Sequence, residues 1–176
     1  MDVKGAAVLY TLAGLMVTFA GFSALLLGVR QAAGARLSRL DQYLARTVMT
    51  RIFVLTGAAL LPPLLGLYDL PEAWVWRVSA VLFAAPMLAL QLTYPYRRRK
   101  VTGQAPPASI LAVLVVLGAA ATAAMLGYIL AGFPHAAAAY TSAVTVDFFT
   151  VAYAFMVALQ VILQQPIAPS DGSAPQ

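Results

Sequence analysis

Asp147 is the residue of this sequence with the clearest potential for chemistry. It is the only acidic residue in the apolar segment from about Ala136 to Leu163. A carboxylate at membrane depth is costly to bury, and such residues often carry protons or bind cations. Tyr140 and Thr150 lie in the same segment. Together with Arg77, they would line a polar path through the outer half of a membrane, which predicts a small transporter or channel.

The position of Asp147 also permits a purely structural interpretation, which we favour. If the spanning helix begins near Thr145, the carboxylate lies in the first turn, where the helix dipole favours a negative charge and water is near. Arg77, at the outer end of another span, can extend its guanidinium group to the membrane surface or pair with Asp147. We therefore expect Asp147 to be interfacial, with proton or ion handling as the alternative.

The sequence offers no pattern for catalysis or for a metal site. It contains no Cys and one His, His135, so a zinc site of the usual type is excluded. No serine stands in a nucleophile motif, no Gly-rich loop precedes a phosphate-binding Lys, and no carboxylate pair has metal-binding spacing. We therefore predict no catalytic residue, no metal, no cofactor and no enzymatic activity.

The composition is that of an all-helical membrane protein. Of the 176 residues, 62% are hydrophobic and 10% are charged, and the mean hydropathy is +0.85. Because lipid offers no partner for the backbone, long apolar runs must form helices, whereas a membrane barrel would show alternating segments of about ten residues. We predict an all-α, polytopic bundle in one domain over residues 1–165, with a disordered tail over residues 166–176.

Five segments are predicted to span the membrane, each near or above the roughly 20 residues required. They cover residues 5–29, 52–68, 73–94, 108–133 and 139–163. Pro62 and Pro63 are expected to kink the second span or to end it early. Only residues 69–72 separate the second and third spans, so these two helices should be antiparallel neighbours.

The distribution of charge predicts the orientation. The loops that follow the first and third spans hold nine of the eleven Lys and Arg residues, whereas the other two loops hold Asp69, Glu72 and no basic residue. Cytoplasmic loops carry the excess of Lys and Arg, so the N-terminus is predicted outside and the C-terminus in the cytoplasm. The preference for Arg over Lys in an Ala-rich chain favours a bacterial inner membrane.

The basic loops also indicate a partner. Basic residues beside apolar runs are typical of contact with anionic lipid at the cytoplasmic face, and not of nucleic-acid binding. The residues expected to contact lipid head groups are Arg36, Arg39, Arg46, Arg97, Arg98, Arg99 and Lys100.

Residues 37–50 combine leucines at helical spacing with interleaved arginines, and Ser38 followed by Asp41 suits a helix start. This pattern predicts either a short amphipathic helix on the inner leaflet or a cytoplasmic extension of the second span. Both alternatives remain open.

Small side chains follow one stripe of the first span and recur in the fourth. Such stripes allow close approach of helix backbones, so the first and fourth helices are predicted to pack together, with a homo-oligomeric interface as the alternative. The residues of these stripes are Gly14, Thr18, Gly21 and Gly28 in the first span and Ala123 and Gly127 in the fourth.

Three functional hypotheses follow. The sparse polar inventory favours a non-enzymatic structural or accessory component of the membrane, alone or within a larger membrane complex. The alternative is a small transporter or channel that uses Asp147 in the outer half of the last helix. The third choice is a protein that binds or modifies lipid head groups through its arginine-rich face.

Overall fold

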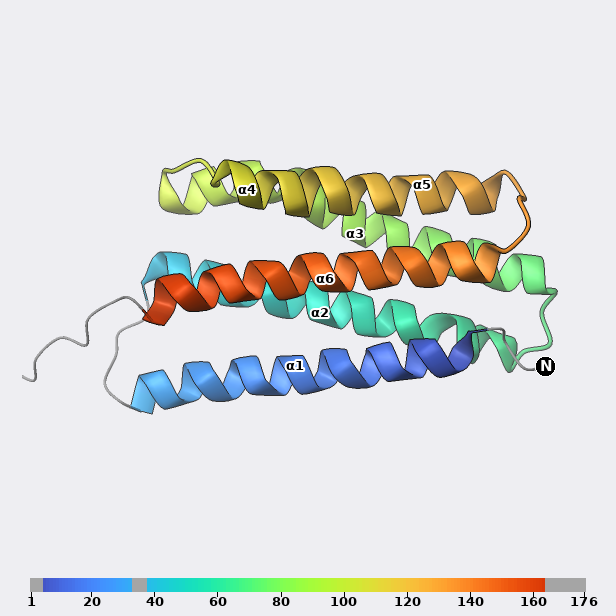
Figure 1. Ribbon diagram of the computed structural model, residues 1–176, viewed down its shortest axis with the longest axis horizontal. Helices are drawn as coiled ribbons and strands as arrows, with labels where there is room; N and C mark the ends of the chain where they lie inside the picture. The colour runs from blue at the N-terminus through green and yellow to red at the C-terminus, as the bar shows by residue number, and fades with distance from the viewer. Residues whose placement is uncertain (1–4, 33–37, 164–176) are drawn as a thin grey trace, which may run out of the picture.

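The computed structural model describes residues 5–32 and 38–163, and these are entirely helical apart from short connections. Five helical segments of this described part are long and apolar enough to cross a membrane. In Figure 1 they run side by side, in alternating directions, as one bundle. The elements are α1 (Ala6–Ala32), α2 (Arg39–Gly66), α3 (Glu72–Thr102), α4 (Ala108–Leu111), a π-helical segment η1 (Ala112–Leu117), α5 (Gly118–Leu130) and α6 (Ala136–Leu163).

Helix α2 joins two segments for which the sequence left two interpretations. It runs without interruption from Arg39 to Gly66, so the separate amphipathic surface helix is wrong and residues 39–50 extend the second span. Its start is held by a capping box, in which the Ser38 hydroxyl accepts from the Asp41 amide at 3.1 Å and the Asp41 carboxylate accepts from the Ser38 amide at 3.0 Å. Residue 37 and the tail 166–176 lie outside the described residues.

Two prolines lie inside α2, yet the helix continues past them to Gly66. Pro62 has no N–H, so the carbonyl of Ala58 four residues earlier lacks its regular helical donor. The hydroxyl of Tyr140 on α6 donates to that carbonyl oxygen at 2.8 Å. The expected early end of the second span is therefore wrong, and the neighbouring helix α6 supplies one of the missing hydrogen bonds.

Helix α3 is longer than the predicted third span. Its 31 residues include the basic run Arg97–Lys100, and the residue that follows its end, Gly103, has a φ of 71° in the left-handed region. At 1.5 Å per residue it measures roughly 46 Å, more than the roughly 30 Å thickness of the hydrocarbon layer. The basic run thus extends the helix instead of forming a loop.

The fourth span consists of α4, η1 and α5, which follow one another without a break. The residues at both junctions, Leu111 and Gly118, keep right-handed helical dihedral angles. A π-helical turn holds an extra residue and is often found at functional sites. Here it ends directly before Gly118.

The predicted packing of the first helix on the fourth is wrong. Helix α1 packs on α2 and α6 through the buried side chains of Leu9, Leu12 and Met16, while α5 packs on α3 and α6. The small-residue stripes of both helices lie on exposed faces. A Cβ atom added to any of their glycines would meet nothing within 4 Å, as found for Gly14, Gly21, Gly28 and Gly127.

The two ends of the bundle differ in charge. One end, which we call the basic end, combines the starts of α2 and α4 with the ends of α1, α3 and α6 (Figure 1). It carries Arg39 and the run Arg97–Lys100. The opposite end carries Asp69 between α2 and α3, Glu72 at the start of α3, and His135 between α5 and α6.

Candidate functional site: a buried polar layer and its cavity

Asp147 lies deep inside the bundle and not in the first turn at one end of its helix. Helix α6 begins at Ala136, about three turns before Asp147, and the side chain has no exposed surface. The interpretation that places Asp147 in the first turn of its helix is therefore wrong, because it required a helix start near Thr145. Alanine is the strongest helix former, and residues 136–139, all alanine, extend α6 toward the opposite end.

Two other helices hold the Asp147 carboxylate. Gln91 on α3 donates from Nε2 to Oδ1 at 2.6 Å, and Thr122 on α5 donates from Oγ1 to Oδ2 at 2.6 Å. Thr122 Oγ1 is also 3.0 Å from the carbonyl oxygen of Gly118. A hydroxyl has one proton to donate, and the charged carboxylate is the stronger acceptor. Asp147 thereby connects α3, α5 and α6.

Gly118 makes room for this contact. A Cβ atom at Gly118 would lie 2.7 Å from Nε2 of Gln91 and 2.9 Å from Oδ1 of Asp147. Both distances are shorter than real Cβ contacts, so a side chain at this position would displace one of the two hydrogen-bonding groups. The absence of a side chain at Gly118 is what lets Gln91 and Asp147 meet beside α5.

Arg51 on α2 adds a positive charge to the same region. Its side chain is 2% exposed, and none of its Nε, Nη1 and Nη2 atoms has a hydrogen-bond partner among the described residues. The guanidinium group and the Asp147 carboxylate attract each other electrostatically. We call Arg51, Gln91, Thr122 and Asp147 the polar layer, because each comes from a different helix and all are buried.

The residues predicted to accompany Asp147 do not contact its carboxylate. The Thr150 hydroxyl donates to the backbone carbonyl of Asp147 at 2.8 Å. Tyr140 is turned toward α2, and its ring packs against Trp76 and Phe83. Arg77 is half-buried and lies beside Trp74 and Leu130 in a hollow near the opposite end. The predicted path through the outer half is therefore not assembled by these side chains.

The basic residues expected at lipid head groups divide into two sets. Arg39, Arg46, Arg99 and Lys100 are exposed, and Arg97 is half-buried. Arg98 differs, because it is 8% exposed and its Nη1 donates to the hydroxyl of Tyr94 at 3.3 Å. The expectation of surface lipid contact is wrong for Arg98, which is turned into the bundle. Arg36 lies outside the described residues.

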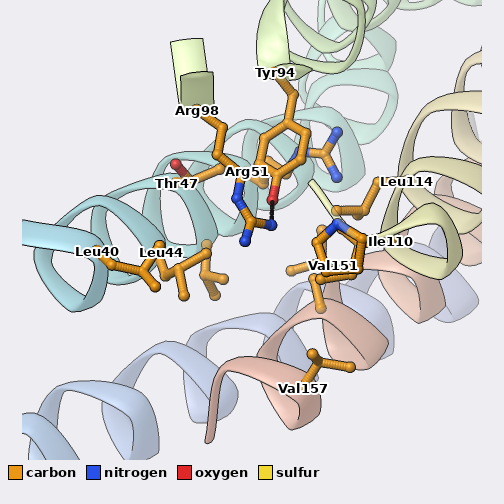
Figure 2. A pocket seen from close by; sticks show the side chains of 13 residues that line it. Leu40, Leu44, Thr47, Arg51, Tyr94, Arg98, Ile110, Leu114, Val151 and Val157 are labelled. Carbon is orange, nitrogen blue, oxygen red and sulfur yellow. Dashed lines mark hydrogen bonds between the residues drawn. The ribbon is translucent and has the colours of Figure 1, made fainter. Parts of the chain in front are cut away.

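A cavity of about 70 Å³ opens between α2, α3, the start of the fourth span and α6. Figure 2 shows Arg51, Tyr94 and Arg98 reaching into it, with the hydrogen bond from Arg98 to Tyr94 drawn. Thr47 is the fourth polar residue of its wall. The other lining residues are apolar: Leu40, Leu44, Val48, Pro107, Ile110, Leu114, Val151, Ala154 and Val157.

Sequence reasoning missed Arg51, Gln91, Thr122 and Gly118. Because the second span is predicted to begin at residue 52, Arg51 falls at the end of the preceding loop, although the helix in fact continues through it. Gln91 is the single amide side chain of α3, and a polar group in a spanning helix usually faces the bundle interior. That rule, applied to Gln91 and Thr122, is the signal that could have placed them beside Asp147.

These features define an all-helical chain with five helical segments, in its described part, long and apolar enough to span a membrane. No protein family, curated protein or solved structure matches it. Among residues 5–32 and 38–163, no group of three or more His, Cys, Asp or Glu side chains lies close enough to hold a metal ion.

Proposed function

We propose that this chain is a multi-pass protein of a bacterial inner membrane, acting as a non-enzymatic structural or accessory component. Its N-terminus lies outside and its C-terminus lies in the cytoplasm. The charge difference between the two ends supports this orientation, because Arg39, Arg46 and the run Arg97–Lys100 lie toward the basic end and cytoplasmic segments carry the excess of Lys and Arg.

The main support for a structural role is that the Asp147 carboxylate is completely enclosed by the protein. Both carboxylate oxygens are engaged by side chains of other helices, and no surface of Asp147 is exposed. Buried polar groups that satisfy one another can hold helices in one register, since any other arrangement leaves a polar group unpaired in an apolar medium. The contacts of Asp147 with Gln91 and Thr122 therefore serve to join α3, α5 and α6.

A small transporter or channel is the second candidate. It is favoured by the presence of a buried Asp147 and a buried Arg51, which attract each other, inside spanning helices, where ionisable groups usually mark a substrate or proton pathway. Protonation of Asp147 would remove the charge that attracts Arg51. Binding and release of this proton would change how strongly Arg51 holds an anion. This change would couple proton transfer to movement of the anion.

Flux through liposomes separates the two candidates. We expect liposomes that contain the purified protein to show no more proton or anion leak than protein-free liposomes, measured with an enclosed pH dye and an enclosed anion-sensitive dye. A leak that depends on protein and is lost in Asp147→Asn would overturn the structural role and establish the transporter.

The orientation is tested separately by cysteine labelling, because the chain contains no Cys. Arg39→Cys and Ala105→Cys place a thiol at exposed positions of the basic end, and Leu70→Cys and Ala138→Cys place one at exposed positions of the opposite end. In intact spheroplasts, a membrane-impermeant maleimide should label only the second pair. Labelling of the first pair instead would reverse the proposed orientation.

A further inference from the structure

We propose that the cavity between α2, α3 and α6 binds a phosphate-type oxyanion, with Arg51 as its principal ligand and Arg98 and Tyr94 beside it. Arg51 is 2% exposed, lines the cavity, and leaves all three guanidinium nitrogens without a hydrogen-bond partner among the described residues. A buried guanidinium with unused donors is costly. An oxyanion in the cavity would accept those hydrogen bonds.

The charged residues around the cavity suit a ligand that carries one negative charge. Arg51 and Arg98 line its wall, while Asp147 attracts Arg51 from within the polar layer. These three groups sum formally to one positive charge. The half-buried Arg97 adds a more distant positive charge that also acts on Arg51. A phosphodiester or a monoanionic phosphate would balance the central charge.

The geometry of the donors also suits an oxyanion. The planar guanidinium group presents paired N–H donors that match two oxygens of a phosphate. Arg98 has one unpartnered buried nitrogen, Nε, besides the Nη1 that donates to Tyr94. The cavity of about 70 Å³ has room for several water-sized groups, each of which needs roughly 10–15 Å³. This is the scale of one phosphate group.

The other residues of the cavity wall indicate which kind of molecule carries the phosphate group. Leu40, Leu44 and Val157 lie toward the basic end, and like most of the lining they are apolar. An apolar wall beside buried arginines favours the head group of an anionic phospholipid, whose glycerol and chains can contact it, over free phosphate. Both sources present the same oxyanion to Arg51. Binding does not depend on the proposed orientation or on the proposed structural role.

Binding can be measured with the purified full-length protein in a neutral detergent by native mass spectrometry. The probes are dioctanoyl phosphatidylglycerol, dioctanoylglycerol, which has the same chains without a phosphate, and inorganic phosphate. We expect the phosphatidylglycerol to bind at least about tenfold more tightly than dioctanoylglycerol, since hydrogen bonds to charged groups are the stronger ones. If only inorganic phosphate binds, the oxyanion site is supported, but its ligand is a soluble phosphate and not a lipid.

Three variants locate the site. Arg98→Gln should weaken binding about tenfold, whereas Arg99→Gln removes an exposed charge from the next residue and should leave binding unchanged. Ala154→Phe fills the cavity and keeps both arginines, so it should abolish binding without removing a buried charge. Equal binding of dioctanoylglycerol, binding of no phosphate probe, or full binding by a folded Ala154→Phe variant would overturn the proposal.

Discussion

The hydroxyl of Tyr140 lies 2.8 Å from the carbonyl oxygen of Ala58, across the interface between α6 and α2. This oxygen is the one whose regular helical donor is missing, because the residue four positions later is Pro62. A membrane interior offers no water to replace such a donor. The bond thus couples a proline in one helix to a tyrosine in another.

Tyr140→Phe is expected to destabilise the fold by about 1 kcal/mol, the usual contribution of a single hydrogen bond. The free energy of unfolding can be measured by SDS titration in mixed micelles, followed by circular dichroism. The effect should nearly disappear in a Pro62→Ala background, where residue 62 can donate its own N–H to Ala58. An equal loss in both backgrounds would show that the hydroxyl does not compensate for the proline. Tyr153→Phe, at a more exposed position of α6, serves as the control.

Gly118→Ala is expected to destabilise the protein by about 1–3 kcal/mol, the usual range for overpacking a buried site. The added methyl group would press against Gln91 and Asp147. Gly127→Ala in the same helix is the matched control, since nothing lies within 4 Å of its added Cβ, and it should be neutral or slightly stabilising. Similar effects of the two substitutions in SDS titration would contradict the close approach at Gly118.

Thr122→Val keeps the shape of the side chain and removes the donor to Asp147. We expect a loss of about 1–2 kcal/mol, because the acceptor is a buried carboxylate. Thr18→Val is the comparison, as the Thr18 hydroxyl is exposed and donates within its own helix to Gly14 at 2.9 Å. Thermal unfolding in detergent should separate the two variants, and equal melting temperatures would argue against a bond between α5 and α6.

The charges of Arg51 and Asp147 are expected to be energetically coupled. Asp147→Asn removes the negative charge that attracts the buried guanidinium group, and we expect a coupling energy of about 0.5–3 kcal/mol, the usual range for interacting residues. Arg51→Met together with Asp147→Asn should be less destabilised than the sum of the two single substitutions. A double-mutant cycle measures this difference. Strict additivity would mean that the two charges do not interact.

Several features of the structure follow from local sequence. The length and apolarity of the runs are sufficient to predict an all-helical chain, and in its described part five helical segments are long and apolar enough to span a membrane. The capping pair of Ser38 and Asp41 at the start of α2 was also predicted. Such features depend on residues of a single helix, which is why they can be recognised in a single sequence.

Only the tertiary structure decides which side of each helix points into the bundle. In helices that are apolar on every side, periodicity does not distinguish the packed face from the lipid-exposed one. The glycine stripe of α1 therefore seemed suited to packing but lies exposed, while Gln91 and Thr122 turn inward. Asp147 meets partners 56 and 25 residues away in the chain. Only the packing of whole helices brings these groups together, since Gln91, Thr122 and Asp147 come from three different helices.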